Sequence, residues 1–354
     1  MGPRVKRYLF LLIACFVGLL APSQRSCATP QFARQANLPC AACHVHASLL
    51  NSFGNRYFAN GFRVGKRKPL SGTPPLWGTL GAAGRANRSL GSAVPIDYGQ
   101  TEIASYGYVD NIELLYHLAY QPTKEQTDIY LLQKLGKEAT VQVGEIGLLG
   151  QYIPKLDVSP SRAVNLLPAG FGDDGPFAPG ANAFAVRVVG SLSGPNAMPY
   201  ADGWKVAATV PFSNEAPSAW QPDFDGSPRG VFAEVFRRSG LSSYGVNAFF
   251  GRDERRYYGL LGQHLVGHVY FEGGFAYAES GASAQRLASL SGTYVPEYHQ
   301  AYALRIDDQN GRIAYVPTAS LMIGDQKSIV RLTAETRIAS GLAPTTTFSA
   351  QFKF

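Results

Sequence analysis

The sequence feature that most constrains the fold is an alternation of apolar and polar residues that recurs from Leu76 to the C-terminus. In residues 328–338, for example, Val330 and Leu332 alternate with Arg331 and Thr333. Successive side chains of a β-strand point to opposite faces, so this pattern predicts strands with one apolar and one polar face. Similar alternating segments occur at residues 184–190, 204–212, 230–237, 267–277, 298–307 and 348–354.

The number of alternating segments favours a closed barrel. About 14–16 of them fit between residues 76 and 354, near the ~10 residues per strand of an outer-membrane barrel. A soluble sandwich or propeller also has alternating strands, but no internal repeat of ~40–50 residues, typical of a propeller, is visible. Phe354 ends an amphipathic strand, which resembles the signal for barrel insertion. Because closure removes strand edges that lipid does not tolerate, we expect an all-β, antiparallel outer-membrane β-barrel over residues 71–354.

Composition excludes two other classes of protein. The chain has 45% hydrophobic and 16% charged residues, against ~25% charged in an ordinary soluble domain, which excludes a disordered tail protein. Beyond residues 1–28 no apolar run approaches the ~18 residues of a spanning helix, which excludes a helical membrane protein. The formal charge of +7 falls to +3 without residues 1–28, which carry four basic residues and no acidic one. No nucleic-acid partner is implied.

Residues 1–28 have the organisation of a secretory signal peptide. A basic start is followed by an apolar stretch from Tyr8 to Leu20 and by Ser26-Cys27-Ala28 as a small-residue cleavage site. Leu12-Ile13-Ala14-Cys15 is open to a second interpretation as a lipid-attachment box. Cleavage after Ala28 leaves two cysteines in the mature chain, both in one motif.

That motif is Cys40-Ala41-Ala42-Cys43-His44, the C-x-x-C-H sequence for attachment of c-type haem. The two thiols form thioethers with the porphyrin, and the His44 imidazole is placed to bind the iron from the proximal face. A zinc site needs two further ligands and only His46 lies nearby, while a thioredoxin-like site needs a βαβ context. The sequence therefore predicts one covalent haem c in a segment comprising residues 29–70.

The residues after the motif predict a short helix. Leu49, Leu50, Phe53 and Tyr57 are spaced by three and four residues, and Gly61 is expected to end the helix. Its apolar face, with Phe53, either lies on the haem or forms an ordinary core stripe. A segment of this size usually needs a metal, a disulfide or a partner surface to fold, and a barrel of 14–16 strands is wide enough to need a filling. We therefore expect the segment to plug the lumen.

The N-terminal part of the chain also resembles a known family. Phe32-Ala33-Arg34-Gln35, the C-x-x-C-H motif, Phe53-Gly54, Arg56-Tyr57 and Asn60-Gly61-Phe62 are similar to the N-terminus of the outer-membrane monohaem cytochrome–porin fusions of iron-oxidising bacteria. The match covers about residues 30–62. Ala36-Asn37 replaces the usual Thr-Gly, and Ala47-Ser48 replaces the frequent Phe-Pro.

The resemblance implies a function in electron transfer across the outer membrane. Extracellular Fe(II) would be the electron donor and a periplasmic c-type cytochrome or similar carrier the acceptor, which corresponds to an Fe(II):cytochrome c oxidoreductase. Outward electron export, a different donor, or a solute porin with a structural haem plug remain as alternatives.

The second axial ligand of the iron is left open by the sequence. From strand parity, His299 should share the lumen face with Arg305 and Asp307, and His117 and His268 should face the lumen by the same argument. These three histidines are candidate distal ligands, each also interpretable as a water-facing residue. Met198 and Met322 are further candidates, and an open or water-bound site is another.

Three charged groups are open to either a functional role or simple solvation. Arg34 is a candidate partner for a haem propionate, and Asp173-Asp174 could attract Fe²⁺ through their carboxylate oxygens. A docking site for an acidic partner, or a propionate site, could be formed by the basic cluster Arg63, Lys66, Arg67 and Lys68.

Overall fold

The computed structural model describes the chain in stretches: residues 38–46, 49–60, 76–87, 96–97, 102–109, 113–121, 126–147, 182–193, 196–198, 201–212, 230–251, 254, 256–280, 283–325, 328–342 and 344–353. The expected leader, Arg34, the basic cluster at 63–68 and Asp173-Asp174 lie outside these stretches. In the described part of the chain, no helix is long and apolar enough to cross a bilayer.

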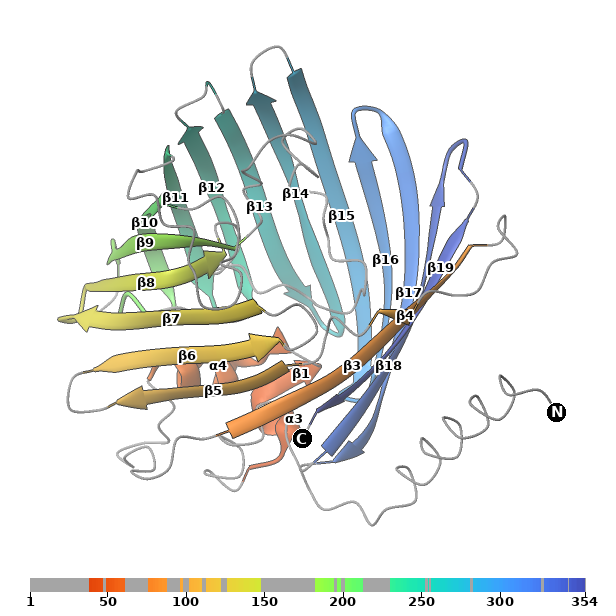
Figure 1. Ribbon diagram of the computed structural model, residues 1–354, viewed down its shortest axis with the longest axis horizontal. Coiled ribbons are helices and arrows are strands. Elements are labelled where there is room, and N and C mark those ends of the chain that lie inside the picture. The colour runs from red at the N-terminus through yellow and green to blue at the C-terminus, as the bar shows by residue number, and fades with distance from the viewer. Residues whose placement is uncertain are drawn as a thin grey trace.

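Antiparallel strands form a closed barrel (Figure 1). They are β3 (Leu76–Asn87), β4 (Ile96–Asp97), β5 (Glu102–Val109), β6 (Leu114–Gln121), β7 (Gln126–Leu135), β8 (Ala139–Gly147), β9 (Asn182–Ser191), β10 (Gly203–Pro211), β11 (Gly230–Ser239), β12 (Ser242–Gly251), β13 (Arg256–Val266), β14 (Val269–Ser280), β15 (Ser283–Glu297), β16 (Gln300–Gln309), β17 (Arg312–Asp325), β18 (Ser328–Ala339) and β19 (Thr345–Lys353). Pairing of β19 with β3 closes the barrel. Apart from the two-residue β4, the described barrel has 16 strands, the upper end of the predicted range.

Side chains alternate between the two faces of the wall as the sequence predicts. In β18, Arg331 and Glu335 are buried, whereas Leu332 and Ile338 are exposed on the outer surface. On the strands from β5 to β19 the outer face is apolar, with exposed leucine, valine, isoleucine and aromatic side chains. An apolar outside and a polar inside are the arrangement of a lipid-embedded barrel.

The two ends of the barrel differ in how the strands are joined. Tight two-residue turns at 240–241, 267–268 and 298–299 join strands at one end. At the other end the joins include 148–181 and 213–229, which lie outside the described residues. The two-residue turn 310–311 lies at the end with these long joins. Outer-membrane barrels have short periplasmic turns and longer extracellular loops, so the end with the long joins is the extracellular end and the opposite end, with turns 240–241, 267–268 and 298–299, is the periplasmic end.

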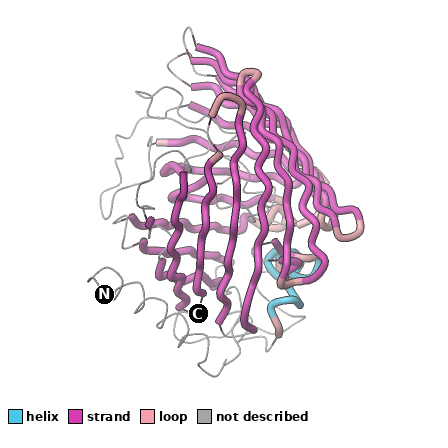
Figure 2. Tube along the Cα trace, turned by 90° about the vertical axis from the view of Figure 1, so that its right-hand side faces the viewer, coloured by secondary structure: helices cyan, strands magenta, loops and turns pink. Residues whose placement is uncertain are grey.

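The N-terminal segment consists of α3 (Cys40–Cys43), β1 (His44–His46), β2 (Leu49–Leu50) and α4 (Ser52–Ala59). It lies at the periplasmic end, beside the turns (Figure 2). The prediction of one helix that includes Leu49 and Leu50 is wrong, because these residues pair with β1 instead. The helix begins after Asn51, whose side chain caps it, and Asn60 rather than Gly61 is its C-cap.

Candidate functional site

The C-x-x-C-H motif forms a compact helical turn followed directly by a strand. Positions 40 and 43 begin and end α3, and His44 is the first residue of β1. Residues three apart lie on one side of a helical turn, so the backbone places positions 40 and 43 on the same side of α3, and His44 follows directly. Cys43 is a partly buried thiol. This donor set, with two thiol positions beside one histidine, fits covalent attachment of haem c.

Asn51 joins the motif to α4. Its Oδ1 accepts a hydrogen bond from the Gly54 amide at 2.9 Å and caps the helix, while its Nδ2 donates to the carbonyls of Ala41 and Ala42 at 3.2 and 3.0 Å. The backbone amide of Asn51 also donates to the Cys43 carbonyl at 2.8 Å. One residue therefore fixes the end of α3 against the beginning of α4.

Gly54 allows the two helices to approach closely. A Cβ atom at this position would lie 2.1 Å from the Cys43 carbonyl oxygen and 3.1 Å from a Leu50 methyl group. No side chain fits at such a distance from a backbone oxygen, so glycine is required where α4 crosses the end of α3. In the sequence, Gly54 was singled out only by the family resemblance, not by its spacing or its neighbours.

Cys43 packs against an apolar cluster shared by the segment and the barrel wall. The cluster contains Tyr57 from α4, Leu115 from β6, Leu132 from β7 and Met198 from the β9–β10 connection. The Phe53 side chain, predicted to contact the cofactor, packs against the same cluster, and its ring lies parallel to that of Tyr57 with centroids 6.3 Å apart. Burial raises the pKa of Tyr57 to about 12, so its hydroxyl is neutral.

β1 is fixed to a second part of the wall. Val45 packs against a cluster of Tyr270, Val295 and Ala301. His46 is 1% exposed; its Nδ1 donates to the Tyr298 carbonyl at 2.7 Å, and its Nε2 lies 3.4 Å from the Ser320 hydroxyl oxygen. Burial lowers the pKa of His46 to about 4, against the raising effect of the Tyr298 carbonyl. His46 is thus a neutral group bonded to the wall, a role that the sequence did not indicate.

The candidate distal histidines have different positions. His117 lies in β6, where its ring stacks on Tyr130 with centroids 4.9 Å apart. His268 and His299 lie in the turns 267–268 and 298–299, both exposed. The parity argument is wrong for these two, because β14 and β16 begin only after the turns and alternation does not extend beyond a strand. It holds within β16, where Arg305 and Asp307 are buried.

The two methionine candidates also lie apart. Met198 is fully buried in the cluster that contacts Cys43. Met322 is buried in β17, and its amide donates to the His299 carbonyl at 2.8 Å. Met322 therefore lies on the side of His46, and Met198 on the side of Cys43.

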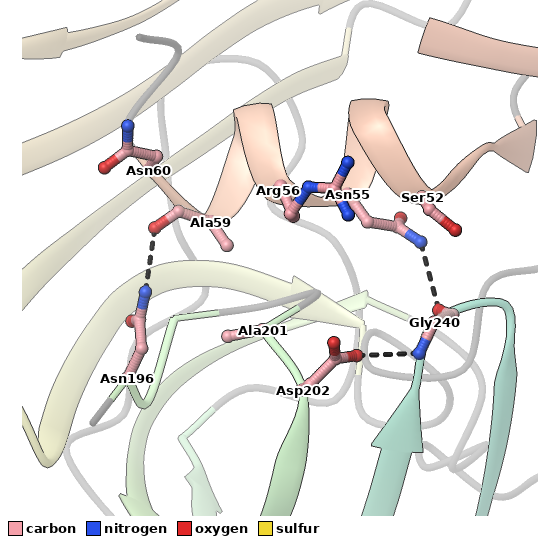
Figure 3. Close-up of a pocket in the computed structure, with 9 residues that line it drawn as sticks. All are labelled: Ser52, Asn55, Arg56, Ala59, Asn60, Asn196, Ala201, Asp202 and Gly240. Atoms are coloured by element: carbon pink, nitrogen blue, oxygen red, sulfur yellow. Dashed lines mark hydrogen bonds between the residues drawn. The ribbon is translucent and has the colours of Figure 1, made fainter. Parts of the chain in front are cut away.

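A polar cavity of about 250 Å³ separates α4 from the barrel turns (Figure 3). Hydrogen bonds cross from α4 to the barrel on both sides of it: Asn55 Nδ2 donates to the Gly240 carbonyl at 3.2 Å, and Asn196 Nδ2 donates to the Ala59 carbonyl at 3.0 Å. Asp202 in turn accepts from the Gly240 amide at 2.8 Å. The segment is therefore attached to the wall by polar contacts as well as by apolar packing.

The inner wall carries buried charges that sequence reasoning located only in part. Arg305 Nε contacts Asp307 at 3.1 Å, Arg337 approaches the same carboxylate at 3.4 Å, and Ser289 donates to it at 2.9 Å. On the opposite part of the wall, Arg187 lies 3.9 Å from Glu234. Among the described residues, no group of three or more histidines, cysteines and acidic residues is arranged to hold a metal ion.

Comparison with known proteins places the fold. No family model matches the chain, and no curated protein matches it. Solved structures do: OmpF of Salmonella typhi in complex with daunomycin, at 10% identity and TM-score 0.57, covers 79% of this chain and 97% of its own. A loop-deletion mutant of OmpT, an outer-membrane protein of Vibrio cholerae, at 12% identity and TM-score 0.55, covers 80% and 99%. An anion-selective porin from Comamonas acidovorans, at 12% identity and TM-score 0.53, covers 79% and 98%. With its apolar outer face and this porin-type fold, the chain is a β-barrel of the bacterial outer membrane.

Proposed function

We propose that the chain is an outer-membrane c-type cytochrome that takes electrons from extracellular Fe(II) and passes them to a periplasmic c-type cytochrome or similar carrier. The observation that supports it is the attachment of a C-x-x-C-H segment to the inside of a membrane barrel through both polar and apolar contacts. The hydrocarbon layer is ~30 Å thick and insulating. A redox group anchored within a barrel gives electrons a route that lipid alone does not provide.

The chain's residues have separable roles in this proposal. The thiols of Cys40 and Cys43 would hold the haem covalently, and His44 would bind the iron. Phe53, Tyr57 and the wall residues of the Cys43 cluster exclude water from the attachment site, which is one of the protein's means of setting a haem potential. Covalently bound haem c supplies a one-electron centre, so each Fe(II) becomes Fe(III) and one electron reaches the carrier.

The periplasmic position of the segment supports the direction of transfer. The segment lies at the periplasmic end, beside the turns 240–241 and 298–299, where a soluble carrier can dock. The donor then has to reach the segment through the barrel from the opposite mouth. The inner side of the wall carries buried charged groups such as Arg187 and Arg305, so the interior is polar and unlike the apolar outer face.

The decisive experiment adds Fe(II) anaerobically to the purified protein in detergent while the haem absorption bands are recorded. Reduction of covalently attached haem is expected, and a Cys40→Ala/Cys43→Ala variant provides a haem-free barrel as control. Absence of covalent pigment on a denaturing gel would overturn the proposal. Pigment that Fe(II) leaves oxidised would remove ferrous iron as donor.

A porin for small solutes is the second candidate, favoured by the likeness to solved porins, one of them anion-selective. Arg187, Lys205 and Arg238 are buried on the inner side of the wall, and their positive charges favour anionic over cationic solutes through their electrostatic field. Vesicles with the protein separate the two functions. A porin carries solute equally well in the native and the haem-free form, whereas the cytochrome oxidises external Fe(II) only when an electron acceptor is present inside the vesicle.

A further inference from the structure

Met198 has an environment that its position in the chain does not explain. It lies in the connection between β9 and β10, yet it has no exposed surface. Its side chain belongs to the cluster that contains Tyr57, Leu115 and Leu132 and against which Cys43 packs. A thioether is thus enclosed in the apolar cluster against which the Cys43 thiol packs.

The backbone at Met198 is tied to the haem-motif segment. Asn196 Nδ2 donates to the Ala59 carbonyl in the last turn of α4 at 3.0 Å, and Asn196 Oδ1 accepts from the Met198 amide at 2.9 Å. The Met198 carbonyl accepts from the Ala201 amide at 3.2 Å. One asparagine side chain therefore fixes the position of Met198 relative to α4.

The other soft or imidazole ligands lie elsewhere. His299 follows Tyr298, which accepts a hydrogen bond from His46, and the Met322 amide donates to the His299 carbonyl. His268 Nδ1 donates to the carbonyl of Val295, a member of the cluster that packs against Val45. All three lie beside β1, the strand that His44 begins, whereas an axial pair has to approach the iron from opposite faces.

His117 lies in β6, away from β1, but it does not belong to the cluster against which Cys43 packs. Its ring stacks on Tyr130, and it is Tyr130 that packs against the cluster. Met198 is the candidate that belongs to the cluster itself.

Resting on the proposed function, we propose that the Met198 thioether is the second axial ligand of the iron bound by His44. Thioether sulfur is a soft ligand, and histidine–methionine ligation raises the potential of a c-type haem. The residue would thereby tune the centre toward accepting electrons from a weak reductant such as Fe(II). Met198→Leu is the informative variant, because leucine conserves volume in a packed core and removes only the sulfur.

The test compares native protein with Met198→Leu and Met322→Leu, a matched change of another buried methionine. Native ferric protein should show the near-infrared sulfur-to-iron absorption of a methionine-ligated haem. Met198→Leu should lose this band, have a lower midpoint potential and bind added cyanide faster, while Met322→Leu behaves as native. Retained mobility of the unheated protein on a denaturing gel confirms that each barrel is folded.

The outcomes separate the ligand from the function. A native haem without the band, a Met198→Leu variant that keeps it, or its loss in Met322→Leu or His117→Ala overturns the assignment of Met198. Haem that Fe(II) still reduces in those cases leaves the proposed function standing. Absence of covalent haem in the native protein overturns the function itself.

Discussion

The Nδ1 atom of His46 lies 2.7 Å from the carbonyl oxygen of Tyr298, which bonds the motif strand to a periplasmic turn of the barrel. On its other side, the unprotonated Nε2 accepts from the hydroxyl of Ser320 at 3.4 Å, and the same hydroxyl accepts from Arg331 Nε at 3.3 Å. One buried imidazole therefore links β1 to the β15–β16 turn and to the wall strand β17. The segment and the barrel are joined two residues after the expected iron ligand.

Replacing His46 with alanine should loosen the segment without unfolding the barrel. Each lost hydrogen bond contributes about 0.5–1.5 kcal/mol, so docking of the segment weakens by roughly 1–3 kcal/mol. Limited proteolysis in detergent should then cut within residues 38–60 faster than in the native protein. His264→Ala is the matched control, because exposed His264 also bonds a serine hydroxyl, that of Ser242 at 2.8 Å, but on the barrel wall. Equal cleavage rates in the two variants would contradict the anchoring role.

Replacing Gly54 with alanine should impair haem attachment. The added Cβ would lie 2.1 Å from the Cys43 carbonyl oxygen, so α4 has to shift away from α3, at a cost of about 1–3 kcal/mol for overpacking. We expect less covalent haem per folded barrel, measured as the ratio of pigment to protein. Gly262→Ala is the control, since its Cβ would lie 3.8 Å from the nearest atom beyond its chain neighbours, the Tyr244 Cβ, which is an ordinary van der Waals contact. Native haem content in Gly54→Ala would disprove the need for glycine.

The barrel could be predicted because its pattern is local. In β18 and β19 the two-residue period places Arg331 and Glu335 inside and Leu332 and Phe348 outside, and lipid on one side with water on the other imposes that period on every strand. Turn positions could not be read in the same way. His268 and His299 continue the apolar/polar alternation of the neighbouring strands in the sequence, but they lie in turns. A two-residue turn ends the alternation of faces without altering the sequence pattern, so these turns could not be located from the sequence.

The site could be predicted only as far as the motif itself. Cys40, Cys43 and His44 are adjacent in the chain, so their proximity follows from spacing. The partners of the segment come from distant strands: Tyr298 is 252 residues from His46, and Gly240 is 185 residues from Asn55. Such contacts depend on how the barrel closes. Leu49 and Leu50 have helical spacing yet pair with β1, because the Asn51 side chain starts the helix later.

Changes at Asn51 should separate capping from bridging. Asn51→Ala removes the cap on Gly54 and both bonds to α3, so we expect a loss of about 1 kcal/mol for the cap and a further loss for the bridge. Asn51→Asp retains an acceptor for the Gly54 amide but cannot donate to the Ala41 and Ala42 carbonyls. Protease sensitivity of the segment should rank native, aspartate and alanine in increasing order. An aspartate variant as sensitive as the alanine variant would show that the cap contributes little.

Replacing Asp307 with asparagine should destabilise the barrel. The carboxylate is 2% exposed and lies beside Arg305 at 3.1 Å and Arg337 at 3.4 Å. Removing the negative charge takes away the carboxylate that contacts buried Arg305, and breaking a buried pair in this way costs about 3–5 kcal/mol. The thermal midpoint of the folded band on unheated denaturing gels should fall. Glu279→Gln is the control, because Glu279 lies 3.6 Å from an exposed Arg256, and surface pairs contribute about 0–1 kcal/mol. Equal midpoints for the two variants would contradict this prediction. They would mean that water in the lumen screens the Asp307–Arg305 pair as effectively as solvent screens the surface pair of Glu279 and Arg256.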